Sequence, residues 1–378
     1  MDFLLNDVQS MLADSIEKFI ANNYDFESRQ KSSGSAAGYS PEVWKTFAEL
    51  GWTAVPFSED DGGFDGGAVD MTVVMERFGR GLVVEPYLAN VVLAGGVLKR
   101  AASDTQKSDW LGPLIAGELQ AALAFVEPQS RYDIGNIVTT ARQDTDTWRI
   151  TGNKAYVLNG GNADLLIIPA RTSGEQDDRD GISLFAVAGD ADGLSIRDYA
   201  TVDGQRAAEL DLKNVTLTSD KLIGDLNGGY PALQAAIADA TLAVSAEAIG
   251  IMGVLTEKTI EYCKSRVQFG VPISSFQALQ HRMVEMYTAC EQSRSLMMWA
   301  AMAIESAGAE SETALHALKY QVGKAGTRVG EEAVQLHGGM GVTWDLDVAH
   351  YFKRLTAINL MFGNADWHLD RLATLTTT

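Results

Sequence analysis

Residues 262–286, YCKSRVQFGVPISSFQALQHRMVEM, decide how the second half of the chain is organised. Apolar residues at helical spacing lead into this stretch, are interrupted at residues 270–272 and resume after Ser274 and Ser275. Proline cannot continue a helix, and serine is a favoured N-cap residue. The stretch therefore predicts one helix, a tight turn, and a second helix that these serines cap.

The predicted turn presents side chains that suit a ligand with a diphosphate and an aromatic group. The residues that flank the interruption are Arg266, Gln268 and Phe269 before it, and Phe276, Gln277, Gln280 and His281 after it. Arginine offers a fixed fork of donors to phosphate oxygens, and phenylalanine offers a flat apolar surface. The alternative is a pair of helices with exposed charge at their junction, and this stretch alone leaves both interpretations open.

Two glycine-containing stretches follow at a distance. Residues 335–341 read QLHGGMG and lie between helical patterns, and residues 361–366 read MFGNAD near the C-terminus. Glycine lets a backbone approach a ligand closely and lets its N–H groups face a phosphate. The order R-x-Q-F-G-x-P-I-x-x-F-Q, then Q-x-H-G-G-x-G, then a glycine turn resembles the acyl-CoA dehydrogenase family over nearly the whole chain. Among its branches, the chain looks like the small-subunit type of pimeloyl-CoA dehydrogenase.

The resemblance implies an α+β fold, mostly α, with three domains. These are an N-terminal helical domain (residues 1–120), a middle β-barrel-like domain (residues 121–228) and a C-terminal four-helix bundle (residues 229–378). The apolar pattern predicts the same order. Strands are expected at residues 121–126, 148–151, 155–158, 165–170, 183–188 and 209–212, with a turn at residues 152–153. Long helices are expected at residues 231–265, 275–308, 310–336 and 344–375, the last interrupted by the glycine turn.

The amino-acid composition limits which partners and which cellular compartment are expected. The 378 residues carry a formal net charge of −20, which argues against nucleic acid and anionic membranes as partners. Cys263 and Cys290 lie in helical patterns and are expected to be reduced core residues. We see no basic region followed by an apolar run at the N-terminus, and no apolar run of the roughly 18 residues that cross a membrane. We therefore expect a cytoplasmic protein without a membrane or nucleic-acid partner.

The resemblance implies FAD as the cofactor, held partly by the β-domain and partly by a neighbouring subunit. It assigns cofactor binding to Val126, Tyr156, Arg266, Gln268, Phe269, Phe276, His281, Gln335, Gly338 and Gly339. Two of these assignments have a plain alternative, because Phe269 and Phe276 could be core residues. A single histidine such as His281 is also more often structural than functional.

The two flavin segments of the β-domain depart from the family pattern. T-E-P-x-x-G-S-D is VEPQSRYD at residues 126–133, so Arg131 and Tyr132 replace the glycine and the serine. Arg131 could bind substrate, for example the distal carboxylate of a dicarboxyl-CoA, or could be a surface residue of a hairpin. K-x-W-I-T/S-N is KAYVLN at residues 154–159. Tyr156 can replace the aromatic residue that packs on the flavin, but Leu158 cannot replace the hydroxyl near the flavin N5.

The catalytic base is the main departure. In the family, a carboxylate removes the α-proton of the thioester while hydrogen bonds polarise the carbonyl. The usual glutamate precedes the glycine of the C-terminal turn, where this chain has Phe362 before Gly363, both expected near the substrate. The position used by other members is Ala240. The remaining candidates are Asp239, Glu247 and Asp366, and for each the alternative is a solvated or ion-paired carboxylate.

Two hypotheses remain. In the first, the chain is an FAD-dependent acyl-CoA dehydrogenase that forms trans-2-enoyl-CoA and passes electrons to an electron-transfer flavoprotein. In the second, it is a non-catalytic subunit that clamps FAD for a related partner carrying the glutamate. The expected assembly is a homo-oligomer or a heterotetramer, and no metal site is predicted. An oxygen-using oxidase on the same scaffold is a third interpretation that no particular residue favours.

Overall fold

The computed structural model describes residues 5–377, with side chains to residue 375. The chain folds into two compact units. The helical unit comprises Met1–Gln30, Gly67–Val83 and Thr241–Thr378, and the β unit comprises Lys31–Gly66 and Val84–Ala240. The expected order of helical, β and helical segments is confirmed. The N-terminal helices are shared between the two units, so the domain boundaries at residues 120 and 228 stay a prediction.

The β unit is built on a mixed sheet of eight strands. The strands are β1 (Ala121–Leu123), β2 (Thr140–Asp144), β3 (Thr147–Leu158), β4 (Leu165–Arg171), β5 (Ile182–Ala188), β6 (Leu194–Ala200), β7 (Arg206–Thr218) and β8 (Leu222–Ile223). Their order is β6-β7-β3-β2-β4-β5-β8, with β1 parallel to β4 on a branch. Buried side chains of β3 and β7 pack in one core with those of β4 and β5, including Trp148 against Phe185 at 5.2 Å between ring centres. The sheet therefore encloses its core, as a barrel does.

Strand β3 corrects the sequence analysis, which expected two strands and a turn at residues 152–153. The strand is continuous, and its pairing with β7 shifts register between Ile150 and Gly152 and again between Lys154 and Val157. A Cβ on Gly152 would lie 2.3 Å from Thr139 Oγ1, so close approach of another segment explains the glycine. Strands β2 and β6 were not predicted, because most of their side chains are polar or partly exposed.

Short helices complete the β unit. They are α3 (Pro41–Glu49), the 3-10 helices η1 (Trp52–Ala54), η2 (Glu59–Asp61), η5 (Gly160–Asn162) and η6 (Ser219–Lys221), the π-helices η3 (Leu88–Ala94) and η4 (Lys107–Leu111), and α5 (Gly95–Ala101), α6 (Asp104–Gln106) and α7 (Gly112–Ile115). Helix α3 shows why such pieces form here. Ser40 caps it by accepting a hydrogen bond from Val43 N, Pro41 occupies the first turn, and Trp44 and Phe47 are buried.

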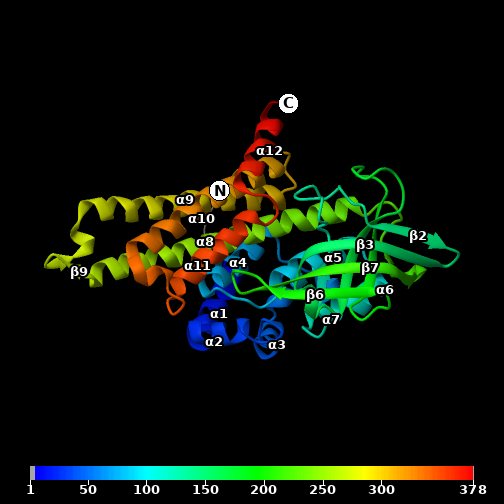
Figure 1. Cartoon of the computed structure of the whole chain (residues 1–378), viewed down its shortest axis with the longest axis horizontal. Coiled ribbons are helices and arrows are strands. Elements are labelled where there is room, and N and C mark those ends of the chain that lie inside the picture. Colours follow the sequence, from blue (N-terminus) through cyan, green and yellow to red (C-terminus); the bar gives the residue numbers. More distant parts are fainter. Residues whose placement is uncertain (1–4, 378) are drawn as a thin grey trace. The chain divides into compact units, whose positions relative to one another are not determined.

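Long helices dominate the helical unit. Its elements are α1 (Asp7–Asn23), α2 (Phe26–Ser33, which continues into the β unit), α4 (Ala68–Gly81), α8 (Tyr230–Ser265), α9 (Gln277–Glu305), α10 (Ser311–His337), the 3-10 helix η8 (Gly338–Val342), α11 (Asp347–Leu360) and α12 (Ala365–Thr377). Helix α10 packs against α9, α11 and α12. Figure 1 shows α9 and α10 side by side, with the β9 hairpin at one end of α9. The expected bundle of long helices is confirmed.

Helix α8 passes from one unit into the other between Ala240 and Thr241. By length and composition it could cross a membrane, which corrects the expectation that no apolar run is long enough. However, 78% of its most apolar window is buried inside the protein. Burial in a core accounts for this composition. Cys263 on α8 and Cys290 on α9 are buried and unpaired, as expected.

Helices α4 and α8 cross at two glycines. A Cβ on Gly250 would lie 2.0 Å from the carbonyl oxygen of Glu76, and a Cβ on Gly79 would lie 2.0 Å from that of Glu247. Side chains at either position would push the two backbones apart. The role of Gly250 is therefore helix packing, and the residue that requires it lies on α4.

We expect Gly250→Ala to lower the unfolding free energy by about 1–3 kcal/mol, because the added methyl group meets backbone that cannot move aside. Chemical denaturation monitored by circular dichroism measures the change. Gly253→Ala is the matched control, since among the described residues outside its own stretch of helix its Cβ would meet the Arg80 guanidinium alone, at 3.4 Å. Alanine is the better helix former, so Gly253→Ala should leave stability unchanged or slightly raised. Equal losses in both variants would contradict the packing argument.

Candidate functional site

The link between α8 and α9 is a β-hairpin. Strands β9 (Val267–Gln268) and β10 (Val271–Pro272) pair antiparallel, and a 3-10 turn, η7 (Ile273–Ser275), follows. Phe269 and Gly270 form the two-residue loop with φ of 55° and 82°. Positive φ at both loop residues suits a two-residue hairpin. The predicted break is confirmed, and the connection is a β-hairpin.

The predicted serine cap is wrong. Helix α9 begins at Gln277, and Phe276 occupies the N-cap position without a side-chain hydrogen bond. The hydroxyl of Ser275 donates instead to the Pro272 carbonyl at 2.7 Å. The hairpin uses up the residues that would otherwise have formed the first turn of the helix.

The hairpin presents uncovered apolar and cationic groups. Phe269 is 93% exposed and Phe276 is 37% exposed, with their ring centres 6.2 Å apart and edge to face. Phe269 is therefore not a core residue of this chain. Arg266 is exposed, and across residues 5–375 its guanidinium makes no described ion pair or side-chain hydrogen bond. Its neighbour Lys264, by contrast, pairs with Glu261 at 2.7 Å.

The glycine stretch lies beside the base of this hairpin. His337, the last residue of α10, stacks on Tyr262 of α8 with ring centres 4.5 Å apart. Gly338 has φ 60° and ψ −142°, and a Cβ on Gly338 or Gly339 would meet nothing within 4 Å. Gln335 is exposed on the last turn of α10. The Tyr262–His337 stack thus brings the two predicted cofactor motifs together.

Two predicted cofactor residues, Gln268 and His281, do not share the arrangement of this group. The amide of Gln268 donates to the Val267 carbonyl at 2.9 Å, and His281 is exposed on α9. The remaining groups are a guanidinium without an ion pair in the described part of the chain, an exposed phenyl ring and an open glycine backbone. This set fits a dinucleotide, whose diphosphate needs cationic and N–H donors and whose aromatic parts need flat apolar partners.

In the β unit, the two predicted flavin segments are joined by a buried ion pair. Lys154 Nζ lies 2.7 Å from Glu127 Oε1, and both side chains are 0% exposed. The Glu127 carboxylate also accepts hydrogen bonds from the N–H groups of Val138 (2.8 Å) and Thr139 (3.1 Å). Burial raises the pKa of Glu127, but Lys154 and the hydrogen bonds from Thr139 and Gln129 outweigh it and hold the pKa below its ordinary value. The Glu and Lys of the two motifs are therefore structural.

This pair positions Val126 and Tyr156. The Val126 carbonyl accepts a hydrogen bond from Ala155 N at 2.9 Å, so the two segments run together. Tyr156 is half-buried and has φ 49°, at the register shift between Lys154 and Val157. Bulges re-aim side chains, and left-handed non-glycine residues gather at functional sites. Leu158 is buried in the core of the β unit.

Arg131 occupies a backbone conformation that favours glycine. Its φ is 49°, its side chain is exposed, and its guanidinium carbon lies 5.7 Å from the ring centre of Tyr132. Glycine adopts this conformation without strain, which explains why a glycine pattern and Arg131 share one backbone path. Arg131 thus presents a positive charge to solvent from a strained loop.

The C-terminal turn separates α11 from α12. Phe362 is half-buried with φ 56°, and Gly363 has φ 110°. A Cβ on Gly363 would lie 2.5 Å from the Trp367 ring and 2.7 Å from His368 Nε2, so only glycine fits. In the β unit, Ala240 is fully buried. Neither Phe362 nor Ala240 can accept a proton.

The three candidate carboxylates have different surroundings. Asp239 lies 2.8 Å from Arg100 Nη2. Glu247 is buried and makes a bidentate pair with Arg354, with N–O distances of 2.6 and 2.7 Å. Asp366 is exposed on the first turn of α12 and makes no ion pair that is described for residues 5–375. Ion pairing holds Asp239 and Glu247, which argues against either as a base.

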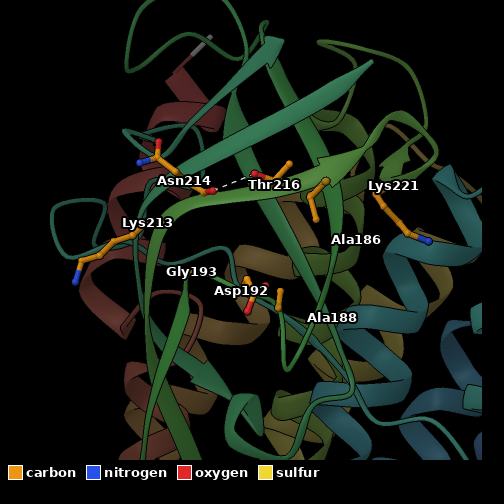
Figure 2. Close-up of a pocket in the computed structure, with 10 residues that line it drawn as sticks. Ala186, Ala188, Asp192, Gly193, Lys213, Asn214, Thr216 and Lys221 are labelled. Carbon is orange, nitrogen blue, oxygen red and sulfur yellow. Dashed lines mark hydrogen bonds between the residues drawn. The ribbon is translucent and has the colours of Figure 1, made fainter. Parts of the chain in front are cut away.

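A hollow of about 510 Å³ lies elsewhere on the β unit, against β5, β7 and the β5–β6 turn. It is lined by Ala186, Ala188, Ala191, Asp192, Gly193, Lys213, Asn214, Thr216, Leu217 and Lys221, none of which is a predicted site residue. Figure 2 shows Lys213 and Lys221 pointing away from each other, and each pairs with a neighbouring aspartate. The two lysine side chains that line the hollow therefore do not converge on one ligand position. Within the described residues, no cluster of His, Cys, Asp or Glu could hold a metal ion.

Comparison with known families accounts for these motifs together. Models of the acyl-CoA dehydrogenase N-terminal, middle and C-terminal domains match residues 6–118, 122–215 and 227–375. The chain belongs to the acyl-CoA dehydrogenase family. Its cofactor is FAD, and the family consists of oxidoreductases.

Individual relatives cover the whole chain at low identity. A Bacillus subtilis (strain 168) protein named "Probable acyl-CoA dehydrogenase YngJ" is 28% identical over 371 residues, 97% of each chain. The solved structure of "PigA with FAD and proline" is 26% identical with a TM-score of 0.93, covering 100% of this chain and 99% of that one. A variant of the "Tcur3481-Tcur3483 steroid ACAD" is 26% identical with a TM-score of 0.87, covering 98% of each chain.

Several groups around the candidate site of this acyl-CoA dehydrogenase family member were missed in the sequence. The ion partner of Glu247, Arg354, is 107 residues away in the chain, so no local pattern reveals it. Lys319 and His368, which contact the C-terminal turn, were also missed. Lys319 gave one usable signal, since it lies on α10 among buried positions at helical spacing, Leu315 and Val322.

Proposed function

We propose that this chain is a subunit of an FAD-dependent acyl-CoA dehydrogenase and supplies the FAD-clamping surface, while a related partner supplies the catalytic glutamate. The observation that carries the proposal is the chemistry of the two base positions, Phe362 and Ala240. The assembly would oxidise an acyl-CoA to the trans-2-enoyl-CoA and pass electrons to an electron-transfer flavoprotein. FAD, when bound, supplies the hydride acceptor.

The surroundings of the other carboxylates support this division of labour. A general base must be free to take a proton from the substrate. Glu247 is held by both arms of Arg354, and Asp239 is held by Arg100. In contrast, two of the proposed FAD-binding groups are available, since Arg266 makes no ion pair within the described residues and Phe269 is 93% exposed. These surroundings support a chain that binds FAD and leaves proton removal to its partner.

Three further points are part of the proposal. The name of the "Tcur3481-Tcur3483 steroid ACAD" joins two proteins, which supports a two-chain assembly for this chain. We propose the pimeloyl-CoA dehydrogenase small-subunit type as the branch, with the exposed guanidinium of Arg131 available to a distal substrate carboxylate. We also propose a cytoplasmic location, supported by two buried, unpaired cysteines.

The test is anaerobic titration of the purified chain, reconstituted with FAD, with a panel of acyl-CoA thioesters. We expect no loss of flavin absorbance at 450 nm from the chain alone, because no residue takes the α-proton. Co-expression with a related chain that carries the glutamate should restore bleaching. Bleaching by the chain alone would overturn the proposal.

Asp366 carries a second candidate function, a dehydrogenase that works without a partner. It lies four residues after Phe362, is exposed and makes no ion pair within the described part of the chain. If the chain alone bleaches its flavin, Asp366→Asn should abolish bleaching. Asp370→Asn, one turn further along α12 and equally exposed, is the control and should leave the rate unchanged.

A further inference from the structure

Beneath the C-terminal turn lies a buried cationic side chain. Lys319 on α10 is 0% exposed, and its ammonium donates to three carbonyl oxygens. These belong to Ile358 (3.0 Å), Asn359 (3.3 Å) and Gly363 (2.8 Å). An ammonium has three donors, so all of them end on the last turn of α11 and the turn that follows it. Lys319 thus satisfies carbonyls that a helix C-terminus leaves without partners.

This ammonium has no carboxylate partner within the described residues. Burial lowers the pKa of Lys319 to about 7. The main compensation comes from the carbonyl dipoles at the C-terminal end of α11, which favour a positive charge there. An apolar side chain of similar length would avoid the desolvation penalty but would remove the Lys319 donor from the Asn359 and Gly363 carbonyls, whereas the Ile358 carbonyl would keep the N–H of Met361. The lysine is therefore specific to the backbone that it holds.

A pair of histidines holds the neighbouring carbonyl. His368 Nε2 lies 3.1 Å from the Phe362 carbonyl, and His368 Nδ1 lies 2.8 Å from His316 Nδ1. A carbonyl only accepts, so His368 Nε2 must carry the proton and His316 Nδ1 must donate to His368 Nδ1. Burial, with nearby Lys319 and His316, lowers the pKa of His368 to about 2, so it stays neutral. The charged groups nearest His316 are Glu312, which pairs with it at 3.7 Å, and Arg371.

The turn is thus held by its backbone. His368 binds the Phe362 carbonyl, and Lys319 binds the Gly363 carbonyl. Neither hydrogen bond involves the side chain of Phe362. A left-handed non-glycine residue persists only where its surroundings over-determine it, and Phe362 has φ 56°. The contacts of Lys319 and His368 supply that constraint.

We propose that Lys319 and His368 are positioning residues, which set the backbone of the Phe362–Gly363 turn and present residue 362 in one direction whatever its side chain. The link from this turn to chemistry rests on the proposed function, in which position 362 lacks the family's base. Under that link the turn is a preformed platform from which only the carboxylate is missing.

The backbone part is tested by hydrogen–deuterium exchange of the chain, read by mass spectrometry on peptides that cover residues 358–368. Lys319→Met and His368→Phe should each speed exchange there by about tenfold, while peptides from α8 and α9 stay unchanged. Lys324→Met is the matched control, because Lys324 is exposed five residues further along α10. Unchanged exchange at residues 358–368, or equal acceleration in every helix, would overturn the proposal.

The functional part is tested by Phe362→Glu in the chain reconstituted with FAD and mixed anaerobically with an acyl-CoA. The installed carboxylate takes the α-proton, the β-hydrogen leaves with its electron pair to FAD, and the C=C bond forms as FAD is reduced by two electrons. We expect Phe362→Glu to bleach the flavin and the Lys319→Met/Phe362→Glu variant to do so at least tenfold more slowly.

The outcomes separate this inference from the proposed function. Bleaching by the unmodified chain would refute the proposed function and leave the exchange experiment to decide the positioning role. Failure of Phe362→Glu to bleach, with FAD retained, would overturn the platform. Equal rates with and without Lys319→Met would overturn the positioning role.

Discussion

Glu247→Gln is expected to lower the unfolding free energy of this acyl-CoA dehydrogenase chain by about 3–5 kcal/mol. The substitution removes the charge that pairs with Arg354, which is 2% exposed and contacts the Glu247 carboxylate through two N–O pairs of 2.6 and 2.7 Å. Gln can accept one of the two hydrogen bonds but cannot neutralise a buried cation. Denaturant titration and thermal melting measure the loss.

Three further variants show whether the loss comes from the pair. Arg354→Met alone should destabilise by a similar amount, because it leaves the Glu247 carboxylate buried and unpaired. The double variant Glu247→Leu/Arg354→Met removes both charges and should recover most of the loss, as replacement of a buried pair by apolar residues often does. Glu257→Gln is the control, since its pair with Arg80 is exposed and should contribute at most about 1 kcal/mol.

The Glu247→Gln variant also tests whether Glu247 is the catalytic base. A base that is not needed for folding would leave the melting temperature unchanged while its replacement abolished flavin reduction. That result would restore Glu247 as a catalytic candidate and would contradict the ion-pair argument. We expect the opposite pattern, with stability lost whether or not substrate is added.

The long helices could be predicted from sequence because the residues that define them lie within each helix or next to its ends. The run of apolar residues in α8 and the proline after Gly270 are local signals, and the helices form where those signals lie. The hairpin at β9 and β10 was read as a plain turn, since two pairs of strand residues are too short to show alternation. Strands β2 and β6 carry mostly polar or partly exposed side chains, so pairing with their neighbours defines them.

The sequence does not explain a glycine that is required by a distant segment of the chain. The sequence predicts a turn at Gly152 and gives no role to Gly250. Both are glycines because a distant backbone passes close by, that of Thr139 in one case and that of Glu76 in the other. A sequence pattern contains the glycine but not the segment that approaches it.

The residues of the candidate site show the same difference between local and distant determinants. The predicted cofactor motifs are contiguous, so resemblance assigns Arg266 and Gly338 from sequence alone, and the Tyr262–His337 stack joins the segments that carry them. The carboxylates were judged by their distance from a motif, whereas their availability depends on partners far along the chain. Arg354 and Arg100 provide those partners, and neither belongs to any motif.

Arg266→Ala is expected to raise the dissociation constant for FAD about ten- to hundredfold. The guanidinium is exposed and makes no ion pair within the described residues, so its donors are available to the diphosphate. Loss of a charged hydrogen-bond partner typically weakens binding by about 1.5–3 kcal/mol, which gives this range. Flavin fluorescence titration of the apo-protein, alone and with a co-expressed partner, measures the constant.

Lys264→Ala is the matched control for this prediction. Lys264→Ala removes one positive charge, two residues before Arg266, from a chain whose net charge is −20. Its long-range electrostatic effect on an anionic cofactor is therefore the same as that of Arg266→Ala. Lys264 already pairs with Glu261, and its loss should change FAD affinity little. If both variants weaken FAD equally, general electrostatics rather than a site at Arg266 would explain the effect.

The hairpin geometry gives a second reason to expect the specific outcome. Phe269 holds a left-handed conformation and leaves 93% of its surface in water, two unfavourable features in one residue. Covering such a ring contributes about 2 kcal/mol, which an isolated chain forgoes. Arg266 lies three residues before this ring and is also exposed in the link between α8 and α9. The affinity lost in Arg266→Ala should therefore be accompanied by a smaller loss in Phe269→Ala, and Lys264→Ala should show neither.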